Sequence, residues 1–353
     1  MQKIRVAIIG QGRSGRDIHG HYFLSDKNTD YQVTAIVDAL EERRERAARE
    51  YGCPVFEKVG DLYGRKDIDL VVNSTFSHMH APVTIDLLNH GFNVICEKPV
   101  AKTYEDGCRM IRAAEANRRL FAPFQQSRFS PIYRKIREIL DTGKLGEIIQ
   151  IDIRFSGFQR RYDWQTSLDY AGGNVRNTGP HPLDQAMDLL GFPEKTEVFS
   201  KLACVNTAGD AEDYAKIMLS VPGKPLIDVE ISSCDTYQAY MYKVQGHYGT
   251  LKATAQHIDL KYYDPKTHPM PKQIMEPLFT AERTPAYCSE KLNWQEEQYD
   301  VQGDAFDTAV PAYYAMIRDT LTDGKPLVIT PQQVLSQLKV IDIIHAQNPL
   351  AVR

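Results

Sequence analysis

The sequence of 353 residues has little net charge and no long apolar run. It holds 42 lysine and arginine residues against 46 acidic ones, and no block of like charge predicts a nucleic-acid or polyanion partner. No apolar stretch approaches the roughly 20 residues that a membrane-spanning helix needs. The N-terminus, MQKIRVAIIG, lacks the long apolar region and the small-residue cleavage site of a signal peptide. We therefore expect a cytoplasmic protein that binds neither nucleic acid nor membrane.

Paired cysteines are absent as well. The six cysteines are scattered, and no two of them form a CxxC pair: Cys53, Cys96, Cys108, Cys204, Cys234 and Cys288. This spacing favours neither a structural zinc site nor a disulfide framework. The length exceeds what one small core can organise, so two domains are expected.

The first third of the chain consists of short apolar runs that alternate with helical stretches. The runs are IRVAIIG (4–10), YQVTAIVD (31–38), DLVVNST (69–75) and NVICEKP (93–99), and the helical stretches include 41–50 and 81–91. Strands separated by helices of this length form βαβ units, whose right-handed connections produce a doubly wound parallel sheet. We expect such an α/β domain over residues 1–123.

After about residue 124 the pattern changes to runs of alternating or β-branched character without regular helices between them. Strands are predicted at 147–157, 196–205, 213–221, 226–233 and 257–263. Helices are predicted within 129–146, ending at Gly143 or Gly146, within 309–321, and within 330–344, where Thr330 is the expected N-cap and Pro331 the first helical residue. These elements predict an α+β domain over 124–353 with a large, mostly antiparallel sheet. Helices on one face would leave the other face open, and a second subunit commonly covers such a face, so a homodimer or homotetramer is expected.

A glycine-rich turn follows the first expected strand. The segment GQGRSG carries Gly10, Gly12 and Gly15 in GxGxxG spacing. The first glycine permits a tight turn, the second lets a pyrophosphate approach the backbone, and the third allows close packing of helix and strand. The helix start at Arg13 and Ser14 offers N–H donors and a favourable dipole to phosphate. The segment predicts a dinucleotide-binding site.

An acidic residue, Asp38, ends the second expected strand. A carboxylate about 20 residues after the glycine turn accepts hydrogen bonds from the ribose hydroxyls and repels a 2′-phosphate. The position therefore favours NAD over NADP. The plainer alternative is that Asp38 only caps the next helix.

Residues 74–80, STFSHMH, follow the expected strand 69–75 at the edge where ligands of such sheets bind. Ser74, Thr75 and His80 are candidate cofactor contacts, although Thr75 and His80 fit a purely structural role equally well. His78 and His80 have no third ligand at suitable spacing, so we expect no metal site.

Two further motifs, EKP at residues 97–99 and NTGPHPLD at 177–184, follow the glycine turn in the chain. With that turn at the very N-terminus, they make the sequence resemble the Gfo/Idh/MocA family of sugar and polyol oxidoreductases. Other segments that look like the family are SRFSP (127–131), TGKLGEI (142–148), EDYAKIMLSV (212–221) and VQGHYGTL (244–251). The resemblance covers nearly the whole chain and departs at Asn177, where the family usually has aspartate.

The resemblance implies a role for each residue of these motifs. Lys98, flanked by Glu97, would lie beside the nicotinamide and the substrate hydroxyl, where its charge favours a developing alkoxide. His181 would be the base that removes the hydroxyl proton. Asp184, one helical turn further, would orient that imidazole or bind substrate.

Other residues would contact the two ligands. Asn177 can exchange hydrogen bonds with a substrate hydroxyl but cannot act as a carboxylate base. Arg160 and Trp164, in RRYDWQ, would approach the sugar, since guanidinium groups bind hydroxyls or carboxylates and aromatic faces stack on sugar rings. Gln126 would contact the carboxamide of the nicotinamide.

The sequence thus predicts an oxidoreductase that uses NAD to oxidise a secondary hydroxyl of a sugar, glycoside or inositol, or to reduce the ketone. One alternative is a redox-neutral NAD-dependent glycosidase, lyase or epimerase that passes through a transient keto sugar. The other is a non-enzymatic regulator that senses the dinucleotide. Intact Lys98 and His181 favour an enzyme, whereas Asn177 keeps the regulator open.

Overall fold

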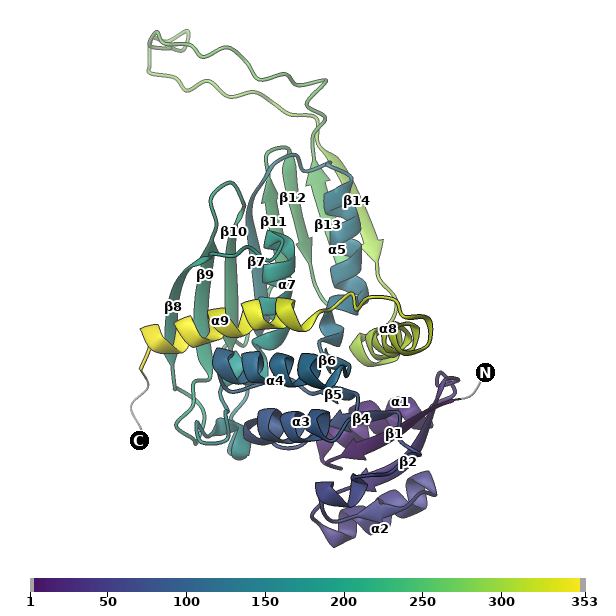
Figure 1. The fold of residues 1–353 in the computed structure, drawn as a ribbon. Coiled ribbons are helices and arrows are strands. Elements are labelled where there is room, and N and C mark those ends of the chain that lie inside the picture. The colour runs from purple at the N-terminus through teal and green to yellow at the C-terminus, as the bar shows by residue number, and fades with distance from the viewer. Residues whose placement is uncertain (1–2, 350–353) are drawn as a thin grey trace.

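A computed structural model describes residues 3–349, which form two β-sheets with helices packed on them (Figure 1). The first sheet has six parallel strands in the order β3-β2-β1-β4-β5-β6. They are β1 (Ile4–Ile9), β2 (Tyr31–Val37), β3 (Val55–Phe56), β4 (Leu70–Asn73), β5 (Val94–Cys96) and β6 (Phe121–Pro123). The order reverses between β1 and β4, so this is a doubly wound sheet with its switch point there. The predicted Rossmann fold is confirmed.

Short helices connect these strands. They are η1 (Arg13–Gly20), α1 (His21–Leu24), α2 (Glu41–Tyr51), η2 (Val59–Leu62), η3 (Ser77–Met79), α3 (His80–Asn89) and α4 (Tyr104–Asn117). The central strands are mostly apolar because helices cover both faces of the sheet: all four residues of β4, of which only Asn73 is polar, and all three of β5 are buried. The helix predicted at 41–50 is α2, which ends at Gly52 in the left-handed conformation.

The second sheet has eight strands in the order β14-β13-β12-β11-β7-β10-β9-β8. They are β7 (Ile148–Ser156), β8 (Glu197–Ala203), β9 (Tyr214–Ser220), β10 (Leu226–Ser232), β11 (Tyr242–Gly246), β12 (Gly249–Ala253), β13 (His257–Tyr262) and β14 (Gln295–Asp300). Only β7 and β10 pair in parallel, so the sheet is mostly antiparallel, as predicted. Three of its strands, β11, β12 and β14, were not among the strands predicted from the sequence.

Helices cover one face of this second sheet, and α6, α7 and α9 contact its strands. The helices of this half of the chain are η4 (Gln126–Phe129), α5 (Pro131–Asp141), η5 (Trp164–Thr166), α6 (Asn174–Asn177), α7 (Pro180–Leu190), η6 (Ala305–Ala309), α8 (Val310–Asp323) and α9 (Pro331–Gln347). Figure 1 shows α5, α7 and α9 in front of the strands. Along β9, buried residues alternate with half-buried ones, as expected for a sheet with one face in the core and one face open. The N-cap at Thr330 is confirmed, since its hydroxyl accepts a hydrogen bond from the backbone N–H of Gln333. Helix α5 ends at Asp141, slightly before the expected glycines.

The last helices return to the first sheet. The Tyr313 hydroxyl donates to the carbonyl oxygen of Pro123 over 2.8 Å, and the Tyr31 hydroxyl donates to that of Tyr314 over 2.6 Å. The Tyr314 ring also stacks on Tyr22 with ring centroids 4.6 Å apart. Helix α8, from the second half of the chain, therefore completes the hydrophobic core of the first half.

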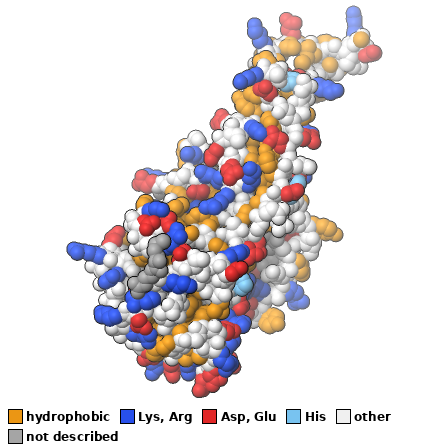
Figure 2. All heavy atoms as spheres, turned by 90° about the vertical axis from the view of Figure 1, so that its right-hand side faces the viewer, with side chains coloured by type: hydrophobic (Ala, Val, Ile, Leu, Met, Phe, Trp, Pro, Cys, Tyr) orange, Lys and Arg blue, Asp and Glu red, His pale blue; other side chains and the backbone are white. Residues whose placement is uncertain are grey.

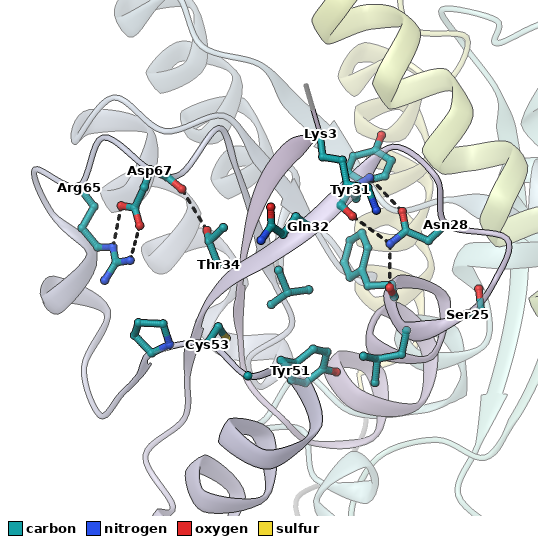
Figure 3. A pocket seen from close by; sticks show the side chains of 15 residues that line it. Lys3, Ser25, Asn28, Tyr31, Gln32, Thr34, Tyr51, Cys53, Arg65 and Asp67 are labelled. Atoms are coloured by element: carbon teal, nitrogen blue, oxygen red, sulfur yellow. Dashed lines mark hydrogen bonds and ion pairs between the residues drawn. The ribbon is translucent and has the colours of Figure 1, made fainter. Parts of the chain in front are cut away.

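The hollow in Figure 3, of about 570 Å³, lies at the starts of the strands of the first sheet. Its lining includes Lys3 before β1, Tyr31 in β2, and the pair Arg65 and Asp67 before β4. Ligands of doubly wound sheets bind beyond the opposite, carboxyl ends of the strands. This hollow is therefore separate from the dinucleotide site. Within residues 3–349, no helix is both long and apolar enough to cross a membrane.

Candidate active site

The glycine turn lies at the carboxyl end of β1. Gly10 has φ +89°, and a Cβ there would stand 2.5 Å from the carbonyl oxygen of Ser74. A Cβ at Gly15 would stand 1.8 Å from the carbonyl oxygen of Gly10. Both positions therefore require glycine, one for the turn and one for the close approach of helix η1. Beside Gly12, in contrast, the nearest atom to such a Cβ is Nη1 of Arg43 at 3.7 Å, which leaves the backbone accessible to a ligand.

Asp38 stands at the end of β2 and faces this turn. One carboxylate oxygen accepts from the backbone N–H of Gln11 over 2.7 Å, and the other accepts from that of Leu40 over 2.9 Å. Nη1 of Arg43 lies 3.6 Å from the same carboxylate. Asp38 thus connects the glycine turn to the chain after β2, at the place where the fold presents an acid to a ribose.

Asn73, at the end of β4, organises the next loop. Its side-chain oxygen accepts from the Thr75 hydroxyl over 2.8 Å, and its side-chain nitrogen donates to the carbonyl oxygen of His80 over 3.0 Å. Ser74 donates from its hydroxyl to the carbonyl oxygen of Ile9 over 2.7 Å. These bonds hold the ends of β1 and β4 together at the switch point of the sheet.

His80 is a buried connector between two loops. Its Nδ1 lies 2.6 Å from the carbonyl oxygen of Pro99, and its Nε2 lies 3.0 Å from that of Thr75. Burial lowers the pKa of His80, although these carbonyl oxygens and Glu97 act in the opposite direction. Of the two roles that the sequence left open, the structure favours the structural one, because both ring nitrogens face the protein.

Glu97 is buried directly after β5. One oxygen accepts from the backbone N–H of Lys98 over 2.9 Å, and the other lies 3.2 Å from Nε2 of His19. Nδ1 of His19 lies 2.7 Å from the Tyr314 hydroxyl. Burial by itself raises the pKa of Glu97, but the hydrogen bond from His19 and the charges of His19, Lys98 and His80 outweigh it and lower the pKa. A buried anion therefore stands behind the lysine.

Lys98 reaches from the first sheet to the second half of the chain. Its Nζ donates to the backbone carbonyl oxygen of Asn177 over 2.8 Å. Burial lowers the pKa of Lys98, the charge of Glu97 raises it, and the charges of Arg13 and Arg161 lower it further, with a net decrease. An ammonium with a lowered pKa beyond the carboxyl end of β5 is suited to act on a polar ligand.

Asn177 ends the short helix α6. Its side-chain oxygen accepts from the side-chain nitrogen of Gln165 over 3.0 Å. Since the oxygen is engaged, the amide nitrogen of Asn177 is left as a donor.

His181 occupies the first turn of α7. Its Nδ1 is buried without a hydrogen-bond partner in the described part of the chain. Burial and then the charge of Lys98 lower the pKa of His181 to about 3, against a smaller opposing effect of Glu97. The imidazole is thus neutral at working pH, its Nδ1 is open to a ligand, and it lies close enough to Lys98 for the lysine charge to act on it.

Asp184 does not occupy the predicted position at the substrate. Its carboxylate is fully buried and accepts hydrogen bonds from Nε and Nη2 of Arg128, over 2.8 and 2.5 Å. The prediction that Asp184 binds substrate or orients His181 is therefore wrong, because this side chain turns into the core between α7 and η4. The arrangement is a buried, bidentate ion pair with a structural role.

The loop 157–173 brings aromatic side chains to the first domain. Trp164 meets Phe76 edge to face with ring centroids 5.0 Å apart, and Tyr170 lies 5.8 Å from Phe76 and 4.7 Å from His78. Phe76 and Tyr170 are exposed, so the group forms a partly open aromatic wall. It supports the predicted approach of Trp164 to a ring-shaped ligand.

Arg160 is exposed, whereas its neighbour Arg161 is half-buried and bonded to Asp163. The charge of Arg161 also acts on Lys98. The structure thus directs Arg161, and not the predicted Arg160, toward the site.

Gln126 is buried in η4, and its side-chain oxygen has no partner among residues 3–349. An orphaned buried acceptor is costly unless a ligand donates to it, and the carboxamide of a nicotinamide is such a donor. Together with the open backbone at Gly12 and the acid at Asp38, it fits the predicted dinucleotide. Within residues 3–349, no group of three His, Cys, Asp or Glu side chains could hold a metal ion.

Several residues of the site carried no separate signal in the sequence. These are Asn73, His19, Gln165 and Phe76. His19 and Phe76 act through partners far along the chain, Tyr314 and Trp164, whereas Asn73 and Gln165 have partners close in sequence but stand in no recognisable motif. The spacing of His19, four residues after Gly15 and so one turn further along a helix, is the one local hint that was available.

Comparisons with known proteins place this arrangement in a family. The description "Oxidoreductase family, NAD-binding Rossmann fold" matches residues 4–124, and "GFO/IDH/MocA C-terminal domain" matches residues 133–252. Oxidoreductase C115.03 of Schizosaccharomyces pombe is 27% identical over 231 residues, which is 64% of this chain and 62% of that protein. The alignment with this first relative thus spans less than two thirds of the relative's length.

Some of the relatives have named activities, and two of these illustrate the range. The 2,7-anhydro-N-acetylneuraminate hydratase of Mediterraneibacter gnavus is 24% identical over 258 residues, 71% of this chain and 67% of that protein. The inositol 2-dehydrogenase of Rhizobium meliloti is 27% identical over 299 residues, 81% of this chain and 86% of that protein.

Solved structures share the fold. An NAD-binding protein from Listeria innocua matches with TM-score 0.79 and 22% identity over all of both chains. The WlbA dehydrogenase from Bordetella pertussis, in complex with NADH and UDP-GlcNAcA, matches with TM-score 0.74 and 18% identity over 98% of this chain and 95% of that one. Since both family domains are matched in order and cover more than half of the chain, this protein belongs to the Gfo/Idh/MocA family of oxidoreductases, and its first domain is an NAD-binding Rossmann domain.

Proposed function

We propose that the protein is an NAD-dependent dehydrogenase that oxidises a secondary hydroxyl of a sugar, glycoside or inositol, or reduces the corresponding ketone. The observation that carries this proposal is the convergence of Lys98 and His181. Nζ of Lys98 contacts α6, and its charge helps to hold the neighbouring imidazole neutral. The likeness to inositol 2-dehydrogenase supports the class of substrate.

Each residue has a definite task in this reaction. The neutral imidazole of His181 takes the proton from the substrate hydroxyl as the C–H bond at the same carbon breaks. The Lys98 ammonium stabilises the negative charge that develops on the substrate oxygen. NAD, when bound, supplies the acceptor for the hydride that leaves the carbon. The carbonyl product keeps the oxygen, and the proton remains on His181.

Asn177 and the aromatic wall orient the substrate. The Asn177 amide nitrogen donates to a substrate hydroxyl because Gln165 already occupies its oxygen. Trp164, Phe76 and Tyr170 present faces and edges against which an apolar face of a sugar ring packs.

A second candidate, a redox-neutral reaction, uses the same residues. In that case oxidation at one carbon acidifies a neighbouring C–H bond, a group is eliminated or exchanged, and the hydride is then returned. The likeness to 2,7-anhydro-N-acetylneuraminate hydratase supports this candidate. Intact Lys98 and His181 argue against a purely sensing role.

The test is a screen of the purified protein with NAD over inositols, sugars and glycosides, read both as absorbance of NADH and as product by chromatography. Net NADH formation with one substrate class supports the dehydrogenase. Product without net NADH supports the redox-neutral candidate. Binding of NAD without conversion of any compound would overturn both and leave the sensing role.

A further inference from the structure

A small cavity lies at the C-terminal end of α9. It has a volume of about 270 Å³ and is lined by Lys102, Leu168, Asp169, Arg176, His345 and Asn348. These residues come from the segment before α4, from the loop that leads to α6, from α6 itself and from the end of α9. None of them belongs to the candidate active site described above. Pockets for larger ligands typically measure about 300–1,000 Å³, so this cavity has room for a small ligand only.

Arg176 brings a buried charge to this cavity. The residue is 8% exposed, yet its Nε has no hydrogen-bond partner among residues 3–349. Its Nη1 lies 3.3 Å from Nε2 of His345, and Nδ1 of that imidazole lies 3.0 Å from the carbonyl oxygen of Ile341. Because Nδ1 must carry a proton to donate to this carbonyl oxygen, Nε2 of the neutral imidazole accepts from Arg176. The guanidinium thus bonds to an uncharged group.

No carboxylate in the described part of the chain forms an ion pair with Arg176. One oxygen of Glu212 accepts from a backbone N–H of α6 over 2.9 Å and lies 3.6 Å from Nε2 of His345. Asp342 accepts from the backbone N–H of Tyr104 over 2.8 Å. The charges of Glu212 and Asp342 raise the pKa of Arg176, but burial outweighs them and lowers it. The guanidinium is therefore buried without a counter-ion of its own.

A buried charge without a counter-charge costs much more free energy than a paired one. Water in the cavity can accept a hydrogen bond from the guanidinium, but it cannot neutralise the charge. An anion in the cavity does both. Guanidinium groups bind carboxylate and phosphate groups through two parallel hydrogen bonds, so the unpaired Arg176 favours an oxyanion over a simple halide.

The other charges around the cavity do not supply the counter-ion. Lys102 and Asp169 are both exposed and carry opposite charges, so they offset each other. Basic side chains elsewhere on the surface have acids beside them, and Figure 2 shows lysine and arginine mixed with acidic side chains over the face turned to the viewer. Arg176 differs from these residues because it is buried and unpaired.

We propose that Arg176 binds a small oxyanion, the carboxylate or phosphate group of a small metabolite, in the cavity at the end of α9. The next residue in the chain is Asn177, whose carbonyl oxygen accepts the bond from Lys98, so the anion site adjoins the candidate active site without sharing its residues. The proposal concerns binding and does not depend on the reaction that the protein catalyses.

The test compares the wild type, Arg176→Met and the control Arg109→Met, all with saturating NAD so that the glycine turn is already occupied. Arg109 is exposed on α4 and does not line the cavity. The melting temperature of each protein is measured in sodium chloride, sodium phosphate and sodium succinate at equal ionic strength. Calorimetric titration with phosphate and with succinate then gives the affinity for each anion.

We expect phosphate, succinate or both to raise the melting temperature of the wild type and of the control above its value in chloride. The anion that acts identifies the group as phosphate or carboxylate. Arg176→Met should bind this anion at least tenfold more weakly. In chloride, Arg176→Met should melt at or above the temperature of the wild type, because the substitution removes a buried charge that has no partner.

Three results would each overturn the proposal. Equal melting temperatures of the wild type in chloride, phosphate and succinate would show that it has no oxyanion site. An unchanged anion affinity in Arg176→Met would place the anion elsewhere on the protein. Arg176→Met that melts well below the wild type in all three salts, or that does not fold, would show that the guanidinium is a structural group satisfied by the protein alone.

Discussion

Nζ of Lys98 donates a hydrogen bond to the backbone carbonyl oxygen of Asn177, 2.8 Å away. This bond joins the end of β5 in the first domain to α6 in the second. Because the acceptor is a backbone atom, the lysine is held whichever side chain stands at residue 177. The family's usual aspartate is thus not needed to position the ammonium.

Replacing Lys98 by methionine keeps the length of the side chain and removes its charge. We expect kcat on the confirmed substrate to fall by about 10²–10³, since electrostatic contacts to a developing oxyanion have this effect. Lys102→Met is the matched control, four residues further along the same segment. A kcat near that of the wild type in Lys98→Met would show that Lys98 has no catalytic role and only ends a strand.

Asn177→Asp tests the departure from the family pattern. The carboxylate can still accept the bond from Gln165, but the amide donor to the substrate is lost. We expect kcat/KM for the true substrate to fall while NAD affinity, measured by calorimetry, stays unchanged. An increase of kcat/KM would show that the amide is not adapted to this substrate.

His181→Ala should lower kcat by about 10²–10⁴, the range for loss of a general base. The pH profile of the wild type gives a sharper test. His181 works as the neutral base, and its pKa near 3 means that it becomes protonated only far below neutral pH. The kcat/KM of the wild type should therefore show no acid limb from His181 near pH 6.5. At the alkaline side, Lys98 should lose its proton below its ordinary pKa of 10.5, and this limb should vanish in Lys98→Met.

Asp184→Asn should destabilise the protein without acting on the chemistry. Removing one partner of a buried ion pair costs about 3–5 kcal/mol, because the Arg128 charge stays behind. Chemical denaturation should show this loss, whereas Glu105→Gln, which breaks the exposed pair with Arg112, should leave the free energy of unfolding nearly unchanged, because solvent screens an exposed pair. The folded fraction of Asp184→Asn should keep the KM of the wild type for the substrate. A large rise in KM at unchanged stability would instead show that Asp184 contacts the substrate.

Asp38→Ala should reduce the preference for NAD over NADP, measured by isothermal titration with both cofactors. The substitution removes the acid that repels a 2′-phosphate and leaves Arg43, now 3.6 Å from the carboxylate, without its partner. Adding Arg43→Ala should abolish any gain in NADP affinity. Equal binding of NAD and NADP by the wild type would contradict the role of Asp38.

The sequence predicted most of the first domain because its signals are local. The glycine turn directly follows the first apolar run and Asp38 directly ends the second, and the structure has both in the expected places. Strand β14 escaped prediction because QEEQYD is polar and pairs on one side alone, with β13. An edge strand at the open end of a sheet buries too little to require an apolar pattern.

The errors in the site have a different origin. Asp184 has the spacing of the family motif, but its partner Arg128 lies 56 positions away. No pattern in either segment predicts this ion pair. Arg160 and Arg161 are adjacent in an irregular loop, where no periodicity tells which side chain turns inward.

The packing of Tyr313 and Tyr314 against the first sheet has a consequence for synthesis. The first sheet ends at Pro123, but the tyrosines that close its core lie 190 positions later in the chain. A ribosome that adds roughly 5–20 residues per second needs roughly 10–40 s to produce them. During that interval the ring of Tyr314 is missing from its contacts with Tyr22, Tyr31 and His19. We therefore expect the nascent first half to leave these side chains incompletely packed until α8 has been synthesised, a state that chaperones commonly protect.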